Sequence, residues 1–343
     1  MPENIAPYQT RGLPPMPSVS RHTLPMAGLL VDVYGLDELS SQRSSLPTTC
    51  LWLLHPRTRN RGVVADIASR ALARWHASAA SKARNLVALA FDMPNHGSRL
   101  VSATANEAWD GGNATHAVDM LGAVRGAVAD VQLLMDLVDG YLGVRADAHA
   151  CLGWSLGGHS AWQAWLGEER VDAAVVVVGC PDYMRGGEDL MSSRAVAGGL
   201  ASSAEAFIGG PHFPPSLVRA CLAHDPKVVL FGGAERPVPS VPLGEQDRER
   251  VRDALDRRRV AGKRLLLCSG GRDALVPPAV GRPVVDVLVD AGRWYDVRVD
   301  SRVYEGVGHA FSKDMVTDAV EFLVDAVARG PREGGEGGRA AKM

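Results

Sequence analysis

One serine in the middle of the chain stands in a glycine pattern that can make it a nucleophile. Residues 153–157 fit G-x-S-x-G with Ser155 at the centre, and Gly158 follows. The pattern requires a sharp turn from strand to helix, where larger flanking side chains would collide with the backbone. A helix that begins after the serine also directs N–H groups at a developing oxyanion. The alternative interpretation is a glycine-rich structural turn.

A serine hydroxyl is a weak nucleophile without a general base, so the chain must supply a histidine. His309 lies in a glycine-containing loop, residues 305–311, where an imidazole can approach the serine closely. We predict that His309 is the base. His212 and His224 remain alternatives in a predicted cap, and His159, one helical turn past the serine, is expected to face away from the oxyanion side.

The third member of such a site is an acid that orients the histidine and stabilises the imidazolium. Asp273 lies in a glycine- and proline-rich loop that directly follows the apolar run 265–268. We predict that its carboxylate holds the histidine. Two alternatives stay open. Asp300, which falls within a strand pattern, competes for this role, and Asp273 could instead be a turn or capping residue ahead of Pro277.

Apolar runs of strand length alternate with stretches of helical periodicity around these residues. The run 173–178 is apolar at every position, which is typical of strands covered on both faces. Strands are predicted at 29–34, 50–54, 86–91, up to Leu152, 173–178, 264–268 and 297–299 with 303–304. Helices are predicted at 63–82, 118–142, after Ser155, 277–292 and 313–328. This alternation predicts an α/β fold with a doubly wound, mostly parallel sheet.

The regions that depart from this alternation of strands and helices define the predicted domain organisation. Residues 1–25 carry six prolines and are expected to form an irregular arm. Residues 26–330 are expected to form one α/β domain. The stretch from about 181 to 262 has glycine and proline clusters and two short helical patterns, so it is interpreted as an inserted cap. Residues 331–343 are expected to be a disordered tail.

These segments together resemble the α/β-hydrolase superfamily over roughly residues 28–330, with serine, acid and histidine in that family's order. Residues 53–56 look like its strand-end His-Gly motif. Residues 91–99 are similar to its Asp-x-x-Gly-x-Gly loop, and closest to the dienelactone-hydrolase and prolyl-oligopeptidase-like branches. The resemblance implies an α/β-hydrolase fold and an esterase-like serine hydrolase.

The resemblance also implies an oxyanion hole made by the backbone N–H groups of Leu156 and of a residue near Arg57. Pro56 stands where the family usually has glycine, and proline has no N–H. The second donor is therefore expected to be Arg57 or a neighbour. His55 and His96 are expected to brace the loops beside the serine rather than to act in catalysis.

The composition favours a small-molecule acyl substrate over a polyanion. The chain has 37 Lys and Arg against 39 Asp and Glu, so no basic excess indicates nucleic acid. No apolar run reaches the roughly 20 residues that span a bilayer. Neither metal-ligand spacing nor a phosphate-binding loop occurs in the sequence, so we expect no metal and no cofactor.

The ends of the chain bear on its location. The first thirty residues lack a basic-then-apolar signal pattern, which favours a cytoplasmic protein. The last three residues, Ala341-Lys342-Met343, are similar to degenerate relatives of the Ser-Lys-Leu peroxisomal address. Import into peroxisomes and a chance ending of a charged tail both stay open.

These observations predict a serine hydrolase that cleaves a carboxylic ester, or a related acyl bond, through an acyl-enzyme on Ser155. Two alternatives remain. The same triad could transfer the acyl group to another acceptor or act on a thioester, or the fold could carry a catalytically silent protein that binds a small ligand.

Overall fold

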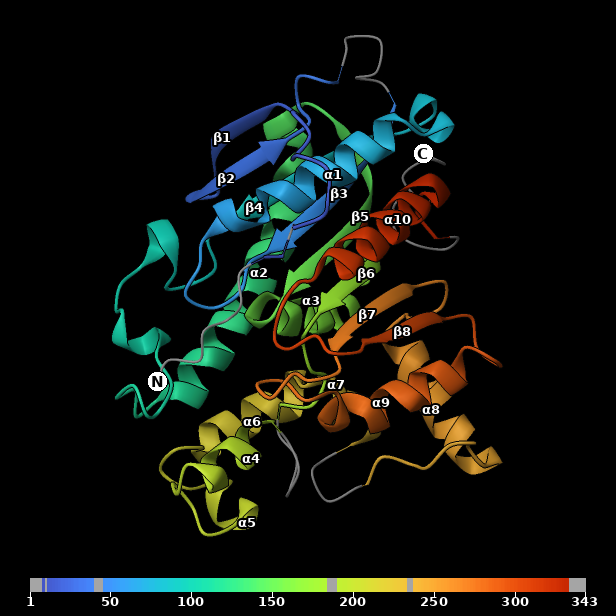
Figure 1. Cartoon of the computed structure of the whole chain (residues 1–343). Coiled ribbons are helices and arrows are strands. Elements are labelled where there is room, and N and C mark those ends of the chain that lie inside the picture. Colours follow the sequence, from blue (N-terminus) through green and yellow to red (C-terminus); the bar gives the residue numbers. More distant parts are fainter. Residues whose placement is uncertain (1–7, 10, 40–45, 184–189, 233–236, 333–343) are drawn as a thin grey trace.

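The computed structural model describes residues 8–9, 11–39, 46–183, 190–232 and 237–332, and contains one eight-stranded sheet (Figure 1). The strand order is β1-β2-β4-β3-β5-β6-β7-β8. The pairs β1–β2 and β2–β4 are antiparallel, and all other neighbouring pairs are parallel. The strands are β1 (Arg21–Met26), β2 (Leu29–Tyr34), β3 (Pro47–Leu54), β4 (Asn85–Phe91), β5 (Arg145–Trp154), β6 (Val171–Val177), β7 (Arg264–Gly270) and β8 (Arg298–Tyr304).

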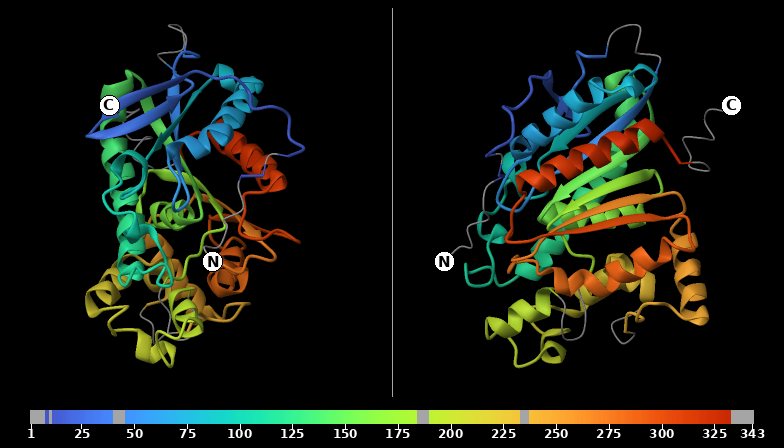
Figure 2. Two further views of the ribbon diagram at one scale, coloured as in Figure 1. Left: turned by 60° about the vertical axis from the view of Figure 1, so that its left-hand side comes forward. Right: turned by 45° about the vertical axis from the view of Figure 1, so that its right-hand side comes forward.

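Helices cover both faces of this sheet. α1 (Ala65–His76) and α10 (Lys313–Arg329) pack together on one face, and α2 (His116–Leu142) and α3 (Leu156–Gly167) on the other. Figure 2 shows α10 running across the face of the sheet that it shares with α1. Because both faces are covered, every residue of β4 is buried, which explains why the central strands are continuous apolar runs.

The described part of the predicted cap, residues 181–262, consists of helices and connecting loops without a strand. Figure 1 shows α4 to α7 beyond the carboxyl ends of the parallel strands. Sites in open α/β sheets lie at this edge, so these helices stand over the place where a site is expected. The helices are α4 (Leu190–Ala197), α5 (Ala204–Phe207), α6 (Pro215–His224), α7 (Pro226–Phe231) and α8 (Glu245–Arg257), and α9 (Pro278–Ala291) follows β7.

The predicted fold class is confirmed, but two predicted boundaries were wrong. Residues 21–25 of the expected irregular arm belong to β1, whose residues pair with β2 from Arg21↔Tyr34 to Met26↔Leu29. Their alternating exposure and Pro25 are features of an edge strand, whose order comes from its partner rather than from its own sequence. The strand before the serine ends at Trp154 rather than at Leu152.

The end of the domain is anchored by Arg332, one of two described residues in the predicted tail. Its guanidinium donates hydrogen bonds to the carbonyl oxygens of Ala261 at 2.9 Å and Glu169 at 2.7 Å. The predicted disorder of the remaining tail, and its last three residues 341–343, lie outside the described residues. None of the described helices is long and apolar enough to cross a membrane.

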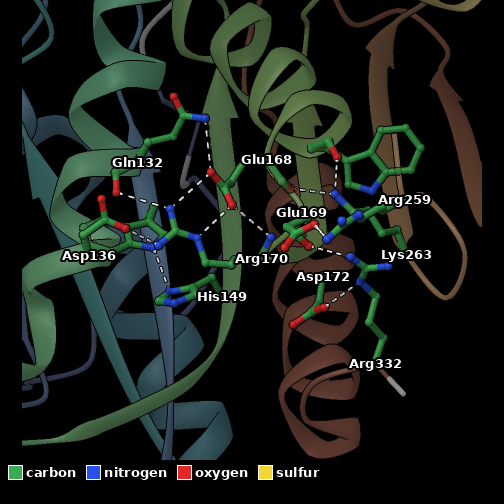
Figure 3. A network of polar contacts seen from close by, with 12 residues as sticks. Gln132, Asp136, His149, Glu168, Glu169, Arg170, Asp172, Arg259, Lys263 and Arg332 are labelled. Atoms are coloured by element: carbon green, nitrogen blue, oxygen red, sulfur yellow. Dashed lines mark hydrogen bonds and ion pairs between the residues drawn. The ribbon is translucent and has the colours of Figure 1, made fainter. Parts of the chain in front are cut away.

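A buried lysine closes the C-terminal end of α3, the helix that begins after Ser155. Figure 3 shows Lys263 among the polar residues at this end, and its Nζ donates to the carbonyl oxygens of Trp165 at 2.7 Å and Glu168 at 2.6 Å. Helix ends leave carbonyl groups without intrahelical partners, and a cation there is favourable. Lys263 therefore satisfies two of these acceptors inside the protein.

We predict that Lys263→Met lowers the free energy of unfolding by about 2 kcal/mol, because the buried carbonyl of Trp165 loses its donor and that of Glu168 keeps only the Val171 N–H. Urea denaturation followed by tryptophan fluorescence measures the change. The matched control is Lys313→Met, at an exposed position at the start of α10, which should stay within about 0.5 kcal/mol of the wild type. Equal stability of the two variants would contradict the capping role.

Candidate active site

Ser155 occupies a strained turn between β5 and α3. Its backbone has φ 54° and ψ −112°, a left-handed region that residues with side chains rarely adopt. The glycines around it let backbone segments approach closely. A Cβ added to Gly153 would lie 1.9 Å from the Gly157 oxygen, and a Cβ added to Gly157 would lie 2.2 Å from the Leu54 oxygen. The local sequence therefore folds into the sharp strand-to-helix turn that exposes a serine Oγ.

His309 reaches Ser155 from the loop between β8 and α10. Its Nε2 lies 2.7 Å from the Ser155 Oγ. The close approach again depends on glycine, because a Cβ added at Gly270, at the end of β7, would lie 2.3 Å from the Gly308 oxygen. The side chain of His309 is 8% exposed.

Asp273 completes a hydrogen-bonded chain from the loop after β7. Its Oδ2 lies 2.8 Å from Nδ1 of His309, while its Oδ1 accepts the N–H groups of Leu275 at 2.9 Å and Val276 at 2.8 Å. A carboxylate oxygen only accepts, so Nδ1 carries the imidazole proton and Nε2 is free to accept the serine proton. The arrangement is that of a nucleophile, a base and an orienting acid.

Three residues that competed for these roles, Asp300, His212 and His224, lie elsewhere. Asp300 pairs with Arg302 along β8. The Nδ1 of His212 lies 3.4 Å from the Ala114 oxygen, and His224 ends helix α6 in the cap region. His159 was expected to face away from the oxyanion side, yet it borders the same hollow as Ser155. Its Nδ1 lies 3.0 Å from the Cys180 oxygen in a buried setting.

The two residues predicted for the oxyanion hole, Leu156 and Arg57, both border the hollow beside Ser155. Leu156 is the first residue of α3, and the first N–H groups of a helix have no intrahelical partner. The oxygen of Pro56 accepts from the Arg59 N–H at 3.3 Å, which fixes the turn that carries Arg57. The Nη1 of Arg57 donates to the Asn106 oxygen at 2.8 Å.

His55 and His96 brace the loops next to the serine, as predicted for structural histidines. The Nε2 of His55 accepts the Met93 N–H at 3.0 Å, so its Nδ1 carries the proton that is donated to the Pro56 oxygen. This joins the ends of β3 and β4. The Nδ1 of His96 lies 2.8 Å from the Pro94 oxygen, and the two imidazole rings meet edge to face.

The hollow itself is small and is closed by a cap residue that the sequence did not indicate. Its volume is about 10 Å³, room for a single water molecule. Arg194 on α4 borders it and donates a hydrogen bond to the oxygen of Leu275, in the loop that carries Asp273. Arg194 is an ordinary helix residue in sequence, so no local signal could have placed it beside Ser155.

This geometry defines a class: a parallel α/β sheet whose carboxyl edge carries a serine turn, a histidine loop and an acid loop. The model of the Alpha/beta hydrolase family matches residues 25–326 of the chain. The chain therefore belongs to the alpha/beta hydrolase family, a class of enzymes, and the resemblance noted in the sequence is confirmed.

Among the solved structures found, two with TM-scores above 0.5 share the fold, and a third is similar at a lower score. A Thermus thermophilus protein has a TM-score of 0.53 at 17% identity, covering 90% of this chain and 98% of its own. A Mycobacterium tuberculosis puromycin-hydrolyzing peptidase has a TM-score of 0.52 at 18% identity, covering 93% of this chain and 40% of its own. A carboxylesterase from Mesorhizobium loti has a TM-score of 0.45 at 13% identity, covering 88% and 98%. A search of curated proteins found no match.

Four buried histidines around the sheet are held neutral. Burial lowers the pKa of each from its ordinary value of 6.5 to about 4, for His55, His116, His149 and His159. Between pH 6.5 and 4 an unfolded chain therefore binds protons at these positions that the folded chain does not bind. Stability from these groups is complete above pH 6.5 and is lost as the pH falls towards 4.

We predict that His149→Gln flattens this acid dependence, because glutamine keeps an acceptor for the Trp52 N–H but cannot titrate. The slope of unfolding free energy against pH, near pH 5, should fall by roughly 1.4 kcal/mol per pH unit. Urea denaturation at pH 7.5, 6 and 5 measures it. His22→Gln, at an exposed position, serves as control. An unchanged slope in His149→Gln would contradict the prediction.

Proposed function

We propose that the protein is a serine hydrolase that cleaves carboxylic esters, with Ser155 as nucleophile, His309 as general base and Asp273 as the orienting acid. The observation that carries this proposal is the continuous chain of contacts from Oγ to Nε2 at 2.7 Å and from Nδ1 to Oδ2 at 2.8 Å. Membership of the alpha/beta hydrolase family supports the reaction class.

In the first half of the reaction, the Ser155 Oγ attacks the ester carbonyl while Nε2 of His309 takes its proton. Asp273 stabilises the resulting imidazolium. The backbone N–H groups of Leu156 and Arg57 donate to the oxyanion of the tetrahedral intermediate. The intermediate collapses, the C–O bond breaks, and the leaving alcohol takes the proton from His309.

In the second half, a water molecule gives a proton to Nε2 of His309 and attacks the acyl-enzyme carbonyl. Collapse of this intermediate releases the carboxylic acid and returns the proton to the Ser155 Oγ. Each proton that leaves a donor is received by the imidazole or by the departing oxygen, so the cycle requires water but no cofactor.

The closed hollow adds a condition for substrate access. The hollow of about 10 Å³ beside Ser155 is smaller than an ester, and α4 and the loop after β7 border it, so a shift of either segment would widen it. The bond from Arg194 to the Leu275 oxygen holds these two segments together. The cap helices therefore control which acyl groups approach the nucleophile.

We predict that a fluorophosphonate probe labels the protein once per chain and that Ser155→Ala abolishes labelling, since only an activated serine reacts. Intact-mass analysis measures the adduct. Ser301→Ala, which removes an exposed serine on β8, is the matched control and should label like the wild type. Retained labelling in Ser155→Ala would refute the assigned nucleophile.

We predict that Asp273→Asn lowers kcat for an activated ester by roughly 10³- to 10⁴-fold, because an amide no longer favours the tautomer with a proton on Nδ1. Steady-state kinetics with a p-nitrophenyl ester measures it. Asp300→Asn tests the competing acid and should change kcat little. The reverse result, with activity lost only in Asp300→Asn, would reassign the acid.

A further inference from the structure

A second cavity lies at the opposite edge of the sheet from Ser155. Its volume is about 580 Å³, and it is bordered by the amino ends of three strands and the end of α10. Asp172 is the second residue of β6, Lys263 directly precedes β7, and Arg264 and Arg298 are the first residues of β7 and β8. Figure 3 shows Asp172, Lys263 and Arg332 grouped at this edge.

The cavity is lined by more cations than anions. Three of its five cationic side chains form ion pairs. Arg332 pairs with Asp172, whereas Arg264 and Arg329 share Asp325. The guanidinium of Arg298 forms no ion pair among the described residues. The cationic lining residues are Lys263, Arg264, Arg298, Arg329 and Arg332, and the acidic ones are Asp172 and Asp296.

The cations form a buried floor and an exposed rim. Lys263 is fully buried, and the side chains of Arg264 and Arg332 are 11% and 9% exposed. The Nη1 of Arg264 is buried without a hydrogen-bond partner. Arg298 and Arg329 are exposed. A negative group in this cavity would meet solvent-accessible guanidinium groups at the rim while it lies over a charged, partly desolvated floor.

Burial first and neighbouring cations second lower the pKa of two floor residues. Burial and then the charge of Arg332 lower the pKa of Lys263 to about 7. Burial also lowers the pKa of Arg264, and the charges of Arg298 and Arg329 add to this, against the effect of Asp325. Each cation therefore makes protonation of its neighbours harder, and a bound anion would relieve this repulsion.

We propose that this cavity is a binding site for a small phosphorylated molecule. A phosphate group has the charge and the oxygen geometry that several guanidinium groups can contact at once. The volume lies within the range of small-ligand sites and exceeds what one phosphate needs, so an organic or condensed phosphate fits better than a free ion. The proposal does not depend on the catalytic role of Ser155.

Hydrogen bonds also connect the cavity to α3, the helix that begins after Ser155. Lys263 on the cavity floor donates to the carbonyl oxygens of Trp165 and Glu168 at the end of α3, whose other end begins after Ser155. Because Lys263 has this structural task, the rim residues are the better positions for substitution.

The experiment is isothermal titration of the full-length protein with inorganic pyrophosphate at low ionic strength. We expect one saturable site per chain. Arg298→Ala should weaken binding by about 10-fold or more, because one charge-assisted contact is lost. Asp296→Asn should strengthen binding, since it removes an acidic lining residue. The matched control is Arg293→Ala, which removes an arginine that is 76% exposed and outside the cavity, and should leave the affinity within about twofold.

Repeating the titration at pH 7.5 in buffers with different ionisation enthalpies measures whether Lys263 on the cavity floor gains a proton on binding. Binding to the wild type should take up more protons than binding to Lys263→Met, because an anion raises the pKa of Lys263 while the proton exchange of pyrophosphate itself is common to both. The absence of saturable binding at millimolar pyrophosphate would overturn the proposal. Equal weakening in Arg293→Ala and Arg298→Ala would overturn it as well, because it would show a general charge effect.

Discussion

The close approach of backbone segments at the serine turn is the constraint on which the rest of the structure depends. An added Cβ at Gly153 or Gly157 would overlap a carbonyl oxygen, and one at Gly158 would lie 3.0 Å from the Val177 oxygen. These contacts bring the ends of β3, β5 and β6 against the start of α3. The central strands must keep their register for that approach, and Ser155 is held at φ 54° as a consequence.

The same constraint recurs where the other two proposed catalytic loops meet. Gly270 lies against the Gly308 oxygen, and the Arg272 N–H donates to the Val307 oxygen at 2.8 Å. The acid loop and the histidine loop are thus joined through their backbones before their side chains interact. With the Asp273 carboxylate also bound by two backbone N–H groups, little freedom remains for the imidazole of His309.

The two ends of the sheet offer different environments that α3 connects. At the carboxyl ends, Arg194 of the cap region borders a small hollow beside Ser155. At the amino ends, no helical cap covers the strands among the described residues, and cationic side chains border a larger cavity. Helix α3 spans the distance, with its N-terminus at the serine and its C-terminus closed by Lys263.

The sequence by itself determined the sheet, the main helices and the serine turn, because continuous apolar runs and glycine spacing record local requirements of the backbone. It also predicted Asp273 and His309, since each follows a strand pattern in a loop rich in glycine. Only the tertiary structure decided that 21–26 form a strand, because β1 is ordered by its pairing with β2. It alone placed Arg194 over Ser155 and joined Lys263 to α3. The contacts of Arg194 and Lys263 connect residues far apart in the chain, so they follow from packing rather than from any local pattern. The β1–β2 pairing is local, but Pro25 and the half-exposed residues of β1 gave no apolar run that would indicate a strand.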